Sequence, residues 1–234
     1  MMPDKVAIVT AAGKGVGAAI ARELAAAGYR VSLMSNSDGA LQLAPELGGI
    51  GMTGSVTEPA DLATLVDATL ETFGRIDAVV NNTGHPPKGD LLDIPDADWH
   101  LGLDMLILNV VRMARLVTPV FVKQGGGAIV NISTFSAFEP RLSFPVSSTL
   151  RSGLASFTKL YADRYAEFGI RINNVLPGYM DNYPETKENL SKIPMKRHGK
   201  VQEIAKTVRF LLSDDAGYIT GQNIRADGGL THSI

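Results

Sequence analysis

Short apolar segments alternate with longer amphipathic segments along all 234 residues, and this alternation restricts the fold more than any other feature. Strands that are apolar on both faces and that alternate with helices form parallel sheets covered by helices on both sides. Apolar strands are expected at 6–10, 30–35, 76–82, 127–133, 170–178 and 222–227, with a further apolar region at 51–56. Helices are expected at 16–28, 58–73, 98–123 (with a bend near Pro119), 147–168 and 201–213. We therefore predict one α/β domain over residues 1–234, with a doubly wound parallel sheet of about seven strands.

The composition argues against several classes of protein. The formal net charge is -2 and no block of basic residues stands out, which argues against a nucleic-acid partner. The chain has no cysteine, which excludes disulfides and fits a reducing compartment, and its four histidines have no metal-ligand spacing. The N-terminal residues lack the pattern of a signal peptide, and no uninterrupted apolar run approaches the roughly 20 residues of a membrane span. We therefore expect a cytoplasmic protein with no metal and no membrane partner.

A glycine-rich turn joins the first predicted strand to the first predicted helix. Gly13, Gly15 and Gly17 alternate there with Lys14 and Val16. Glycines in this position let the backbone approach a pyrophosphate closely, and the helix N-terminus offers free N–H groups to the phosphates. The turn is not a P-loop, because no Gly-Lys-Ser/Thr follows at the required spacing. The pattern favours dinucleotide binding over a merely tight turn.

Three further motifs follow the glycine turn in order. They are NNTG at Asn81–Gly84, LPG at Leu176–Gly178 and ITGQNIRADGG at Ile219–Gly229. With the turn, they make essentially the whole chain resemble the short-chain dehydrogenase/reductase family. The resemblance implies a doubly wound sheet, a nicotinamide cofactor, a small-molecule substrate and a homo-oligomer, either a tetramer or a dimer. Ala11 departs from the family pattern, which has glycine at that position.

The end of the second predicted strand indicates which nicotinamide cofactor the chain binds. NAD enzymes place a carboxylate there for the ribose hydroxyls, and that carboxylate would repel the 2′-phosphate of NADP. Here Ser35 stands at that position, with Asn36 beside it, and Lys14 is placed as in NADP-preferring members of the family. We therefore predict NADP(H) in preference to NAD(H). The alternative for Lys14 is a solvated loop residue.

The resemblance implies further cofactor contacts from the ends of three other strands. These residues are Ser55, Val56, Asn82, Thr83, Gly84, Pro177 and Gly178. Ser55 replaces the family's usual aspartate near the adenine, and Thr83 replaces its usual alanine beside the ribose.

The catalytic positions of the family carry unexpected residues here. The family uses a tyrosine as proton donor, a lysine four residues later, a serine that binds the substrate oxygen, and an asparagine that supports a relay water. The matching positions in this chain hold Ser147, Arg151, Thr134 and Leu106, while Asn109 lies one turn beyond Leu106. Serine is far harder to ionise than a phenol, and arginine hardly serves as a proton shuttle. Arginine can still hold ribose hydroxyls or an oxyanion through its planar fork.

Ser147 and Arg151 also have simpler structural interpretations. Ser147 is a candidate helix N-cap, and Arg151 is a candidate surface ion pair. Thr134 is a candidate substrate-binding residue at a strand end. A proton could instead come from His85 or from Tyr179, Asp181 or Tyr183 in the segment 179–197, which we expect to be a mobile substrate loop. The sequence does not choose among them.

Three functions are compatible with these residues. The favoured one is an NADP(H)-dependent oxidoreductase, acting between a small carbonyl and alcohol or between an imine and amine, with a non-standard proton-transfer site. The second is an NADP(H)-binding protein or sensor without redox turnover, because tyrosine, lysine and asparagine are lost together. The third, ranked last, is a non-redox enzyme resembling the halohydrin dehalogenases, which have arginine at the lysine position but keep the tyrosine.

Overall fold

The computed structural model describes residues 4–233 and contains one seven-stranded parallel sheet with the strand order β3-β2-β1-β4-β5-β6-β7. The strands are β1 (Val6–Thr10), β2 (Arg30–Ser35), β3 (Ile50–Thr53), β4 (Ala78–Asn81), β5 (Gly127–Ile132), β6 (Ile170–Pro177) and β7 (Asn223–Ala226). The predicted single α/β domain with a doubly wound sheet is therefore confirmed. The chain winds outward in one direction from β1 to β3 and in the other from β4 to β7, so the strand order reverses between β1 and β4.

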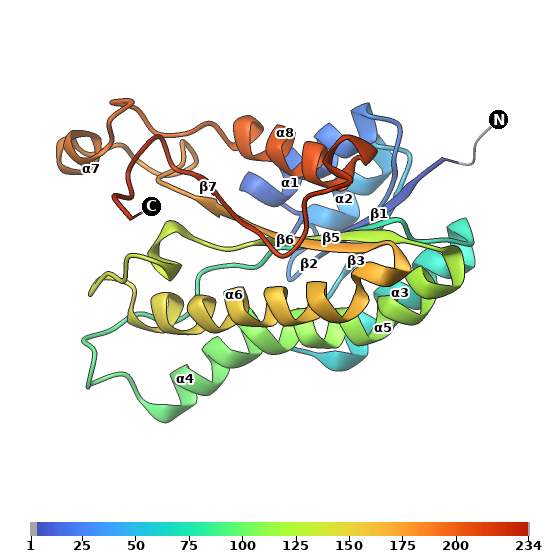
Figure 1. Ribbon diagram of the computed structural model, residues 1–234, viewed down its shortest axis with the longest axis horizontal. Helices are drawn as coiled ribbons and strands as arrows, with labels where there is room; N and C mark the ends of the chain where they lie inside the picture. The colour runs from blue at the N-terminus through green and yellow to red at the C-terminus, as the bar shows by residue number, and fades with distance from the viewer. Residues whose placement is uncertain (1–3, 234) are drawn as a thin grey trace.

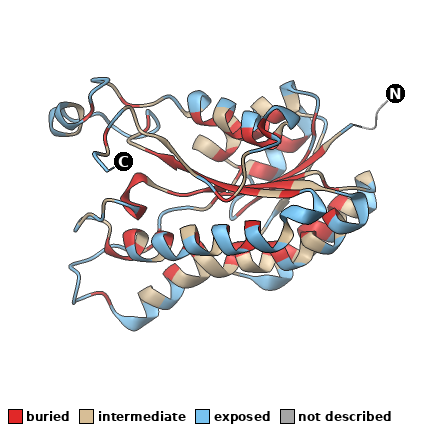
Figure 2. Ribbon diagram, in the orientation of Figure 1, coloured by how far each residue is buried: buried red, intermediate tan, exposed pale blue. Residues whose placement is uncertain are grey.

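Helices cover both faces of the sheet (Figure 1). They are α1 (Gly15–Ala26), α2 (Gly39–Glu46), α3 (Pro59–Phe73), α4 (Asp96–Leu103), α5 (Asn109–Gln124), α6 (Pro145–Tyr165), α7 (Lys187–Lys192) and α8 (Val201–Leu212). On one face, Leu24 of α1 and Val208 of α8 belong to the same apolar core. On the other face, Leu65 of α3 and Phe121 of α5 belong to a second core. Figure 2 shows the buried positions concentrated on the sheet and on the inward sides of these helices.

Two helices were not expected from the sequence, and one expected helix is irregular. Helices α2 and α7 are short, and the apolar pattern gave no sign of either. The expected helix 98–123 consists of α4 and α5 joined by a π-turn at Asp104–Leu108. Helix α5 continues through Pro119, so the break in the regular hydrogen-bond pattern lies earlier than the bend predicted from proline.

The continuous helical segment Asp96–Gln124 is long and apolar enough to cross a membrane by length and composition alone. In this fold several of its apolar residues pack in the protein core. Met113, Val117 and Phe121 are fully buried in the core between α5 and the sheet. A helix that faces a protein core passes the same test of length and composition, so this segment is explained as a core helix.

A row of asparagines, three of them buried and one half-buried, crosses four strands of the sheet. The side-chain amide of Asn81 donates to Asn131 Oδ1 (2.9 Å), that of Asn131 to Asn174 Oδ1 (2.9 Å), and that of Asn174 to Asn223 Oδ1 (2.7 Å). The hydroxyl of Thr158 on α6 also donates to Asn174 Oδ1, at 3.0 Å. These bonds satisfy polar groups that would be costly to bury alone, and they help to fix the lateral register of β4 to β7.

Replacing the central asparagine tests this ladder. Asn131→Ala removes the acceptor of Asn81 and one donor to Asn174, so we expect the free energy of unfolding to fall by about 3 kcal/mol. Chemical denaturation would measure the change. Gln42→Ala, on the exposed face of α2, is the control, with an expected change of less than about 0.5 kcal/mol. Equal effects for the two variants would contradict a structural role for the ladder.

The turn after β1 contains a strained residue. Ala11 has a φ of 46°, in the left-handed region that disfavours any residue with a Cβ. Gly15, four residues later, has a φ of 56° and carries no such penalty. The departure of Ala11 from the family pattern therefore falls at a backbone position where glycine is the less strained residue.

We expect Ala11→Gly to raise the free energy of unfolding by about 1 kcal/mol, because relief of the left-handed alanine exceeds the added flexibility of the unfolded chain. The same substitution in the middle of α1, Ala19→Gly, should lower it by about 1 kcal/mol. Denaturation of both variants distinguishes relief of strain from a general effect of glycine. A loss of stability in Ala11→Gly would show that the alanine is not strained.

Candidate cofactor and active site

The candidate site lies at the carboxyl ends of the strands, where the strand order reverses between β1 and β4. Open α/β sheets bind ligands in the crevice at this position. The segments that follow β4, β5 and β6 gather at one end of the sheet, together with α7 (Figure 1). The residues predicted for cofactor and substrate come from these segments, from the ends of β1, β2 and β3, and from the N-terminal turns of α1 and α6.

The glycine turn forms a close-packed cradle. A Cβ on Gly17 would lie 2.2 Å from the carbonyl oxygen of Ala11, and one on Gly13 would lie 2.8 Å from Ser35 Oγ. Both positions therefore exclude a side chain. Helix α1 begins at Gly15, and no side chain caps its first N–H groups. The cradle presents the free N–H groups and positive end of a 12-residue helix, which is the arrangement that binds phosphate groups.

Hydrogen bonds tie the segment after β4 to this cradle. Thr10 Oγ1 donates to the carbonyl oxygen of Asn82 (2.7 Å) and accepts from its backbone N–H (2.9 Å). The side-chain amide of Asn82 donates to the carbonyl oxygen of Ala11 (3.2 Å). Asn82 is buried, whereas Thr83 is half-buried and Gly84 is exposed. The predicted residues Asn82, Thr83 and Gly84 therefore lie beside the glycine turn, and Asn82 holds the two segments together.

At the end of β2, Ser35 has an internal role. Its side chain is buried, and its hydroxyl donates to the carbonyl oxygen of Ser37 (2.7 Å) and accepts from the backbone N–H of Ala40 (3.0 Å). Ser35 thereby shapes the start of α2, whose Gly39 lies against Gly13. The exposed polar groups here are Lys14, Asn36, Ser37 and Asp38.

Ser55 and Val56 follow β3 and are both half-buried. The hydroxyl of Ser55 lies 2.7 Å from Thr57 Oγ1, and its backbone N–H donates to Asp61 Oδ2 (2.8 Å). Asp61 was not singled out from the sequence. Its place in the first turn of a helix, three residues after Glu58, gave the only available signal. A carboxylate thus lies beside Ser55, for which the resemblance implies a position near the adenine.

Arg151 is the most unusual side chain of the site. It is only 7% exposed, one of its terminal nitrogens donates to the carbonyl oxygen of Ile132, and its Nε has no hydrogen-bond partner within residues 4–233. It forms no ion pair in that range, so the proposed surface ion pair is wrong. Burial lowers the pKa of its guanidinium to about 10, which still leaves the group charged at neutral pH. A buried cation without an acidic partner is destabilising unless a ligand supplies acceptors.

Ser147 lies in the first turn of α6, the helix that carries Arg151, and Thr134 follows the end of β5. Helix α6 begins at Pro145 with Phe144 as its N-cap residue, so the interpretation of Ser147 as an N-cap is wrong. Ser147 and Thr134 are both half-buried. Ser136 Oγ lies 3.5 Å from Thr134 Oγ1, so the Thr134 hydroxyl makes only a long contact.

The π-turn places Leu106 and Asn109 on the helix that packs against α6. Leu106 is buried and cannot support a water through its side chain. The side-chain amide of Asn109 donates to the carbonyl oxygen of Met105 (2.5 Å), and its Oδ1 has no hydrogen-bond partner within residues 4–233. Asn109 therefore stabilises the π-turn through one end of its amide and leaves a buried acceptor at the other.

The predicted substrate loop 179–197 is mostly exposed and contains α7. A bridge between Met180 and Gly199 closes its base, and Asp181 accepts from the backbone N–H of Val201 at the start of α8. Pro177 and Gly178 precede it, and a Cβ on Gly178 would lie 2.8 Å from the backbone of Asp227. This close packing fixes the direction in which the loop leaves β6.

Two contacts bring this loop over the crevice. A Cβ on Gly15 would lie 3.3 Å from the amide nitrogen of Asn182, so Asn182 lies against the glycine cradle. Tyr183 Oη lies 2.6 Å from His85 Nε2, which connects the loop to the segment after β4. Asn182 was missed because only its distance from Pro177 marks it in the sequence.

An apolar cluster borders the same end of the sheet. It is formed by the buried residues Phe135, Ile193 and Leu230, with Phe144 and Tyr179 packed against them. These side chains come from three segments of the chain, namely the stretch between β5 and α6, the loop 179–197 and the stretch after β7, so no local pattern predicts their association. The cluster packs the loop 179–197 against the stretch between β5 and α6.

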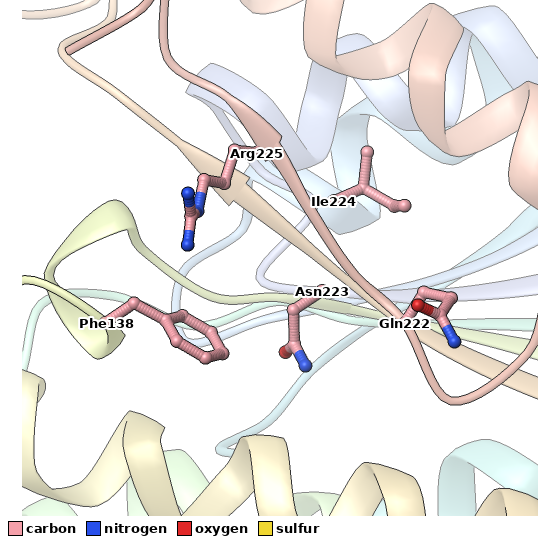
Figure 3. A pocket seen from close by; sticks show the side chains of 5 residues that line it. All are labelled: Phe138, Gln222, Asn223, Ile224 and Arg225. Atoms are coloured by element: carbon pink, nitrogen blue, oxygen red, sulfur yellow. The ribbon is translucent and has the colours of Figure 1, made fainter. Parts of the chain in front are cut away.

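A separate surface pocket lies on the edge strand β7, as Figure 3 shows. It is lined by Phe138, Gln222, Asn223, Ile224 and Arg225. Its principal contact is the guanidinium of Arg225 over the ring of Phe138, 5.5 Å from the ring centroid. None of the residues predicted for the cofactor or the substrate lines it.

Comparisons with known proteins agree with this geometry. A family model described as enoyl-(acyl carrier protein) reductase matches residues 10–231. The chain is 31% identical over 236 residues to the 3-oxoacyl-(acyl-carrier-protein) reductase FabG of Escherichia coli, covering 97% of each chain. It is 33% identical to the 3-oxoacyl-(acyl-carrier-protein) reductase of Synechocystis, covering 97% of this chain and 96% of the relative. It is also 33% identical to dehydrogenase/reductase SDR family member 4 of Caenorhabditis elegans, covering 97% and 95%. The chain therefore belongs to the short-chain dehydrogenase/reductase family of oxidoreductases.

Proposed function

We propose that the chain is an NADP(H)-dependent oxidoreductase that acts on a small carbonyl/alcohol or imine/amine substrate. The observation that carries this proposal is the pairing of a glycine cradle at Gly13–Gly17 with the buried Arg151 near the end of β5, which has no acidic partner in the described part of the chain. A ligand with phosphate groups at one end and hydroxyl groups at the other would supply hydrogen-bond partners to the cradle and to Arg151. We also infer a cytoplasmic homo-oligomer, a tetramer or a dimer, in which the exposed apolar residues Val122 and Leu160 of α5 and α6 are covered.

The residues present fit a nicotinamide dinucleotide. The cradle and the N-terminus of α1 would hold its pyrophosphate, with Asn182 beside them. Thr83, Gly84 and Arg151 would border the ribose at the nicotinamide end, and Ser55 and Val56 would border the adenine. The bound nicotinamide supplies a hydride, while the protein orients the substrate and moves the proton.

Lys14 supports the choice of the phosphorylated cofactor. Its side chain is exposed and forms no ion pair within residues 4–233, so its ammonium is free to meet a phosphate. Asn36 and Ser37 are exposed at the end of β2 and offer an amide and a hydroxyl. The nearby carboxylate of Asp38 accepts from Thr53 Oγ1 (3.1 Å), a residue of the neighbouring strand β3. Lys14, Asn36 and Ser37 therefore suit the 2′-phosphate, whereas the exposed carboxylate of Asp38 would oppose it.

Lys14→Ala should weaken NADPH binding by about tenfold, because a charge-assisted hydrogen bond to the 2′-phosphate is lost. NADH binding should change less than twofold. Titration of nicotinamide fluorescence measures both affinities, and Lys123→Ala on α5 is a control for loss of a surface charge. An equal loss for the two cofactors would contradict a specific contact with the 2′-phosphate.

Arg151 is proposed to contact the ligand rather than to support the fold. Replacing it with methionine removes one hydrogen bond but also removes an uncompensated buried charge. We expect Arg151→Met to leave the free energy of unfolding unchanged or to raise it by about 1 kcal/mol, while NADPH binding weakens by about tenfold. Denaturation and fluorescence titration on the same samples test both parts. A destabilised variant that binds NADPH normally would assign Arg151 to the fold.

Hydride transfer itself tests the proposed function. The oxidation of NADPH would be followed with an acetoacetyl thioester, chosen because two relatives are named as 3-oxoacyl reductases, and with a panel of small ketones, enones and imines. Turnover of any of these supports the oxidoreductase. Tight NADPH binding without turnover across the panel would favour the alternative, a cofactor-binding protein or sensor, which the loss of the family's tyrosine and lysine makes a specific candidate.

A further inference from the structure

The proposed reduction needs a proton donor, and the position of the family's tyrosine holds Ser147. A serine hydroxyl does not match a phenol in acidity, and the buried Arg151 stays charged at neutral pH. The identity of the proton donor, an inference that rests on the proposed function, follows from the residues around the crevice. Among the described residues near the crevice, Tyr179 only stacks its ring on that of His198, with the centroids 5.8 Å apart, whereas one phenol is hydrogen-bonded to a histidine.

That phenol belongs to Tyr183. Its Oη lies 2.6 Å from His85 Nε2, and the two ring centroids are 5.3 Å apart at an interplanar angle of 58°. The distance is that of a short hydrogen bond, and the tilt allows the histidine nitrogen to point at the phenol oxygen in the ring plane. The pair joins the segment after β4 to the substrate loop after β6, which are 98 residues apart in sequence.

Neighbouring contacts place this pair at the crevice. His85 follows Gly84 directly, and three residues later Lys88 Nζ lies 5.0 Å from the ring centroid of Phe144, the N-cap residue of α6. On the other loop, Asn182 precedes Tyr183 and lies against the glycine cradle. The pair therefore lies between the cradle and the N-terminal end of the helix that carries Ser147 and Arg151.

The surroundings favour a neutral imidazole at His85. Burial, followed by the charges of Lys88 and Arg151, lowers the pKa of this histidine from its usual value near 6.5. A neutral ring with its proton on Nε2 donates to the phenol oxygen. The phenol hydrogen then stays free to face a substrate, and the same N–H stabilises the phenolate that forms when this proton leaves.

We propose that Tyr183 is the proton donor of the reaction and that His85 is a positioning residue that holds the phenol and stabilises its conjugate base. In the reduction, the substrate carbon gains a hydride from the reduced nicotinamide and the electron pair of the C=O or C=N bond moves to oxygen or nitrogen. The O–H bond of Tyr183 breaks, and its proton goes to that atom. Solvent then returns a proton to the phenolate through His85, which is partly buried and partly open to solvent.

Removal of the phenol hydroxyl tests the donor. Tyr183→Phe keeps the ring contact with His85, so we expect kcat for NADPH-dependent reduction of the best substrate of the panel to fall by about 100-fold. KM and NADPH affinity should change less than twofold. Tyr218→Phe removes a fully exposed phenol elsewhere and is the control. His85→Asn should lower kcat by a smaller factor with KM unchanged, and His100→Asn on the exposed face of α4 is its control.

A second measurement does not depend on turnover. Nitrogen-15 NMR of the free protein reports which ring nitrogen of His85 carries the proton. We expect protonation at Nε2 near neutral pH and a changed Nε2 resonance in Tyr183→Phe. A proton on Nδ1, or a His85 spectrum that Tyr183→Phe leaves unchanged, would overturn the pairing.

The outcomes separate this inference from the function on which it rests. Turnover by the wild type with an unaffected kcat in Tyr183→Phe would overturn the donor role and leave the oxidoreductase function intact. Failure of the wild type to turn over any substrate while NADPH binds would overturn both the oxidoreductase function and the donor role of Tyr183. A raised KM with normal kcat in Tyr183→Phe would make Tyr183 a binding residue and would also refute the donor role.

Discussion

The close approach of α1 to the end of β1 determines the geometry of the whole site. A Cβ at position 17 would lie 2.2 Å from the carbonyl oxygen of Ala11, so only glycine allows this contact. The contact lets α1 pack on the sheet through Ile20 and Leu24, and it directs the helix N-terminus into the crevice between β1 and β4. Because Asn82 also bonds to the Ala11 carbonyl, the segment after β4 is fixed by the same turn.

Arg151, at the other end of the crevice, lowers the stability of the free protein. Arg151 is buried and, among the residues that the structure describes, has one backbone acceptor and no acidic partner, an arrangement that costs stability in the free protein. Buried groups left unsatisfied in a native structure often mark a ligand site, because the ligand supplies the missing partners. The unpartnered Nε of Arg151 and the open N-terminus of α1 thus point to one extended ligand with acceptors at both ends.

Much of the fold was predictable from the sequence, because buried parallel strands such as Val6–Thr10 are read directly from apolar runs bounded by turns. Other features depend on contacts that no local pattern encodes. The π-turn at 104–108 is a change of hydrogen-bond register, and Ser35 turns inward because α2 starts beside it. The contacts of Asn182 with the cradle and of His85 with Tyr183 join distant segments. His85 and Tyr183 were candidates from the sequence although their pairing was not predictable, and Asn182 was not a candidate at all.

The central claim is that the cradle and Arg151 form one site for a phosphorylated nicotinamide cofactor. The most direct measurement is a fluorescence titration of the purified protein with NADPH and with NADH. We predict saturable binding of NADPH at least about tenfold tighter than that of NADH, since the 2′-phosphate adds a charge-assisted contact. Equal affinity for both would refute the role assigned to Lys14. Binding of neither would contradict the account as a whole.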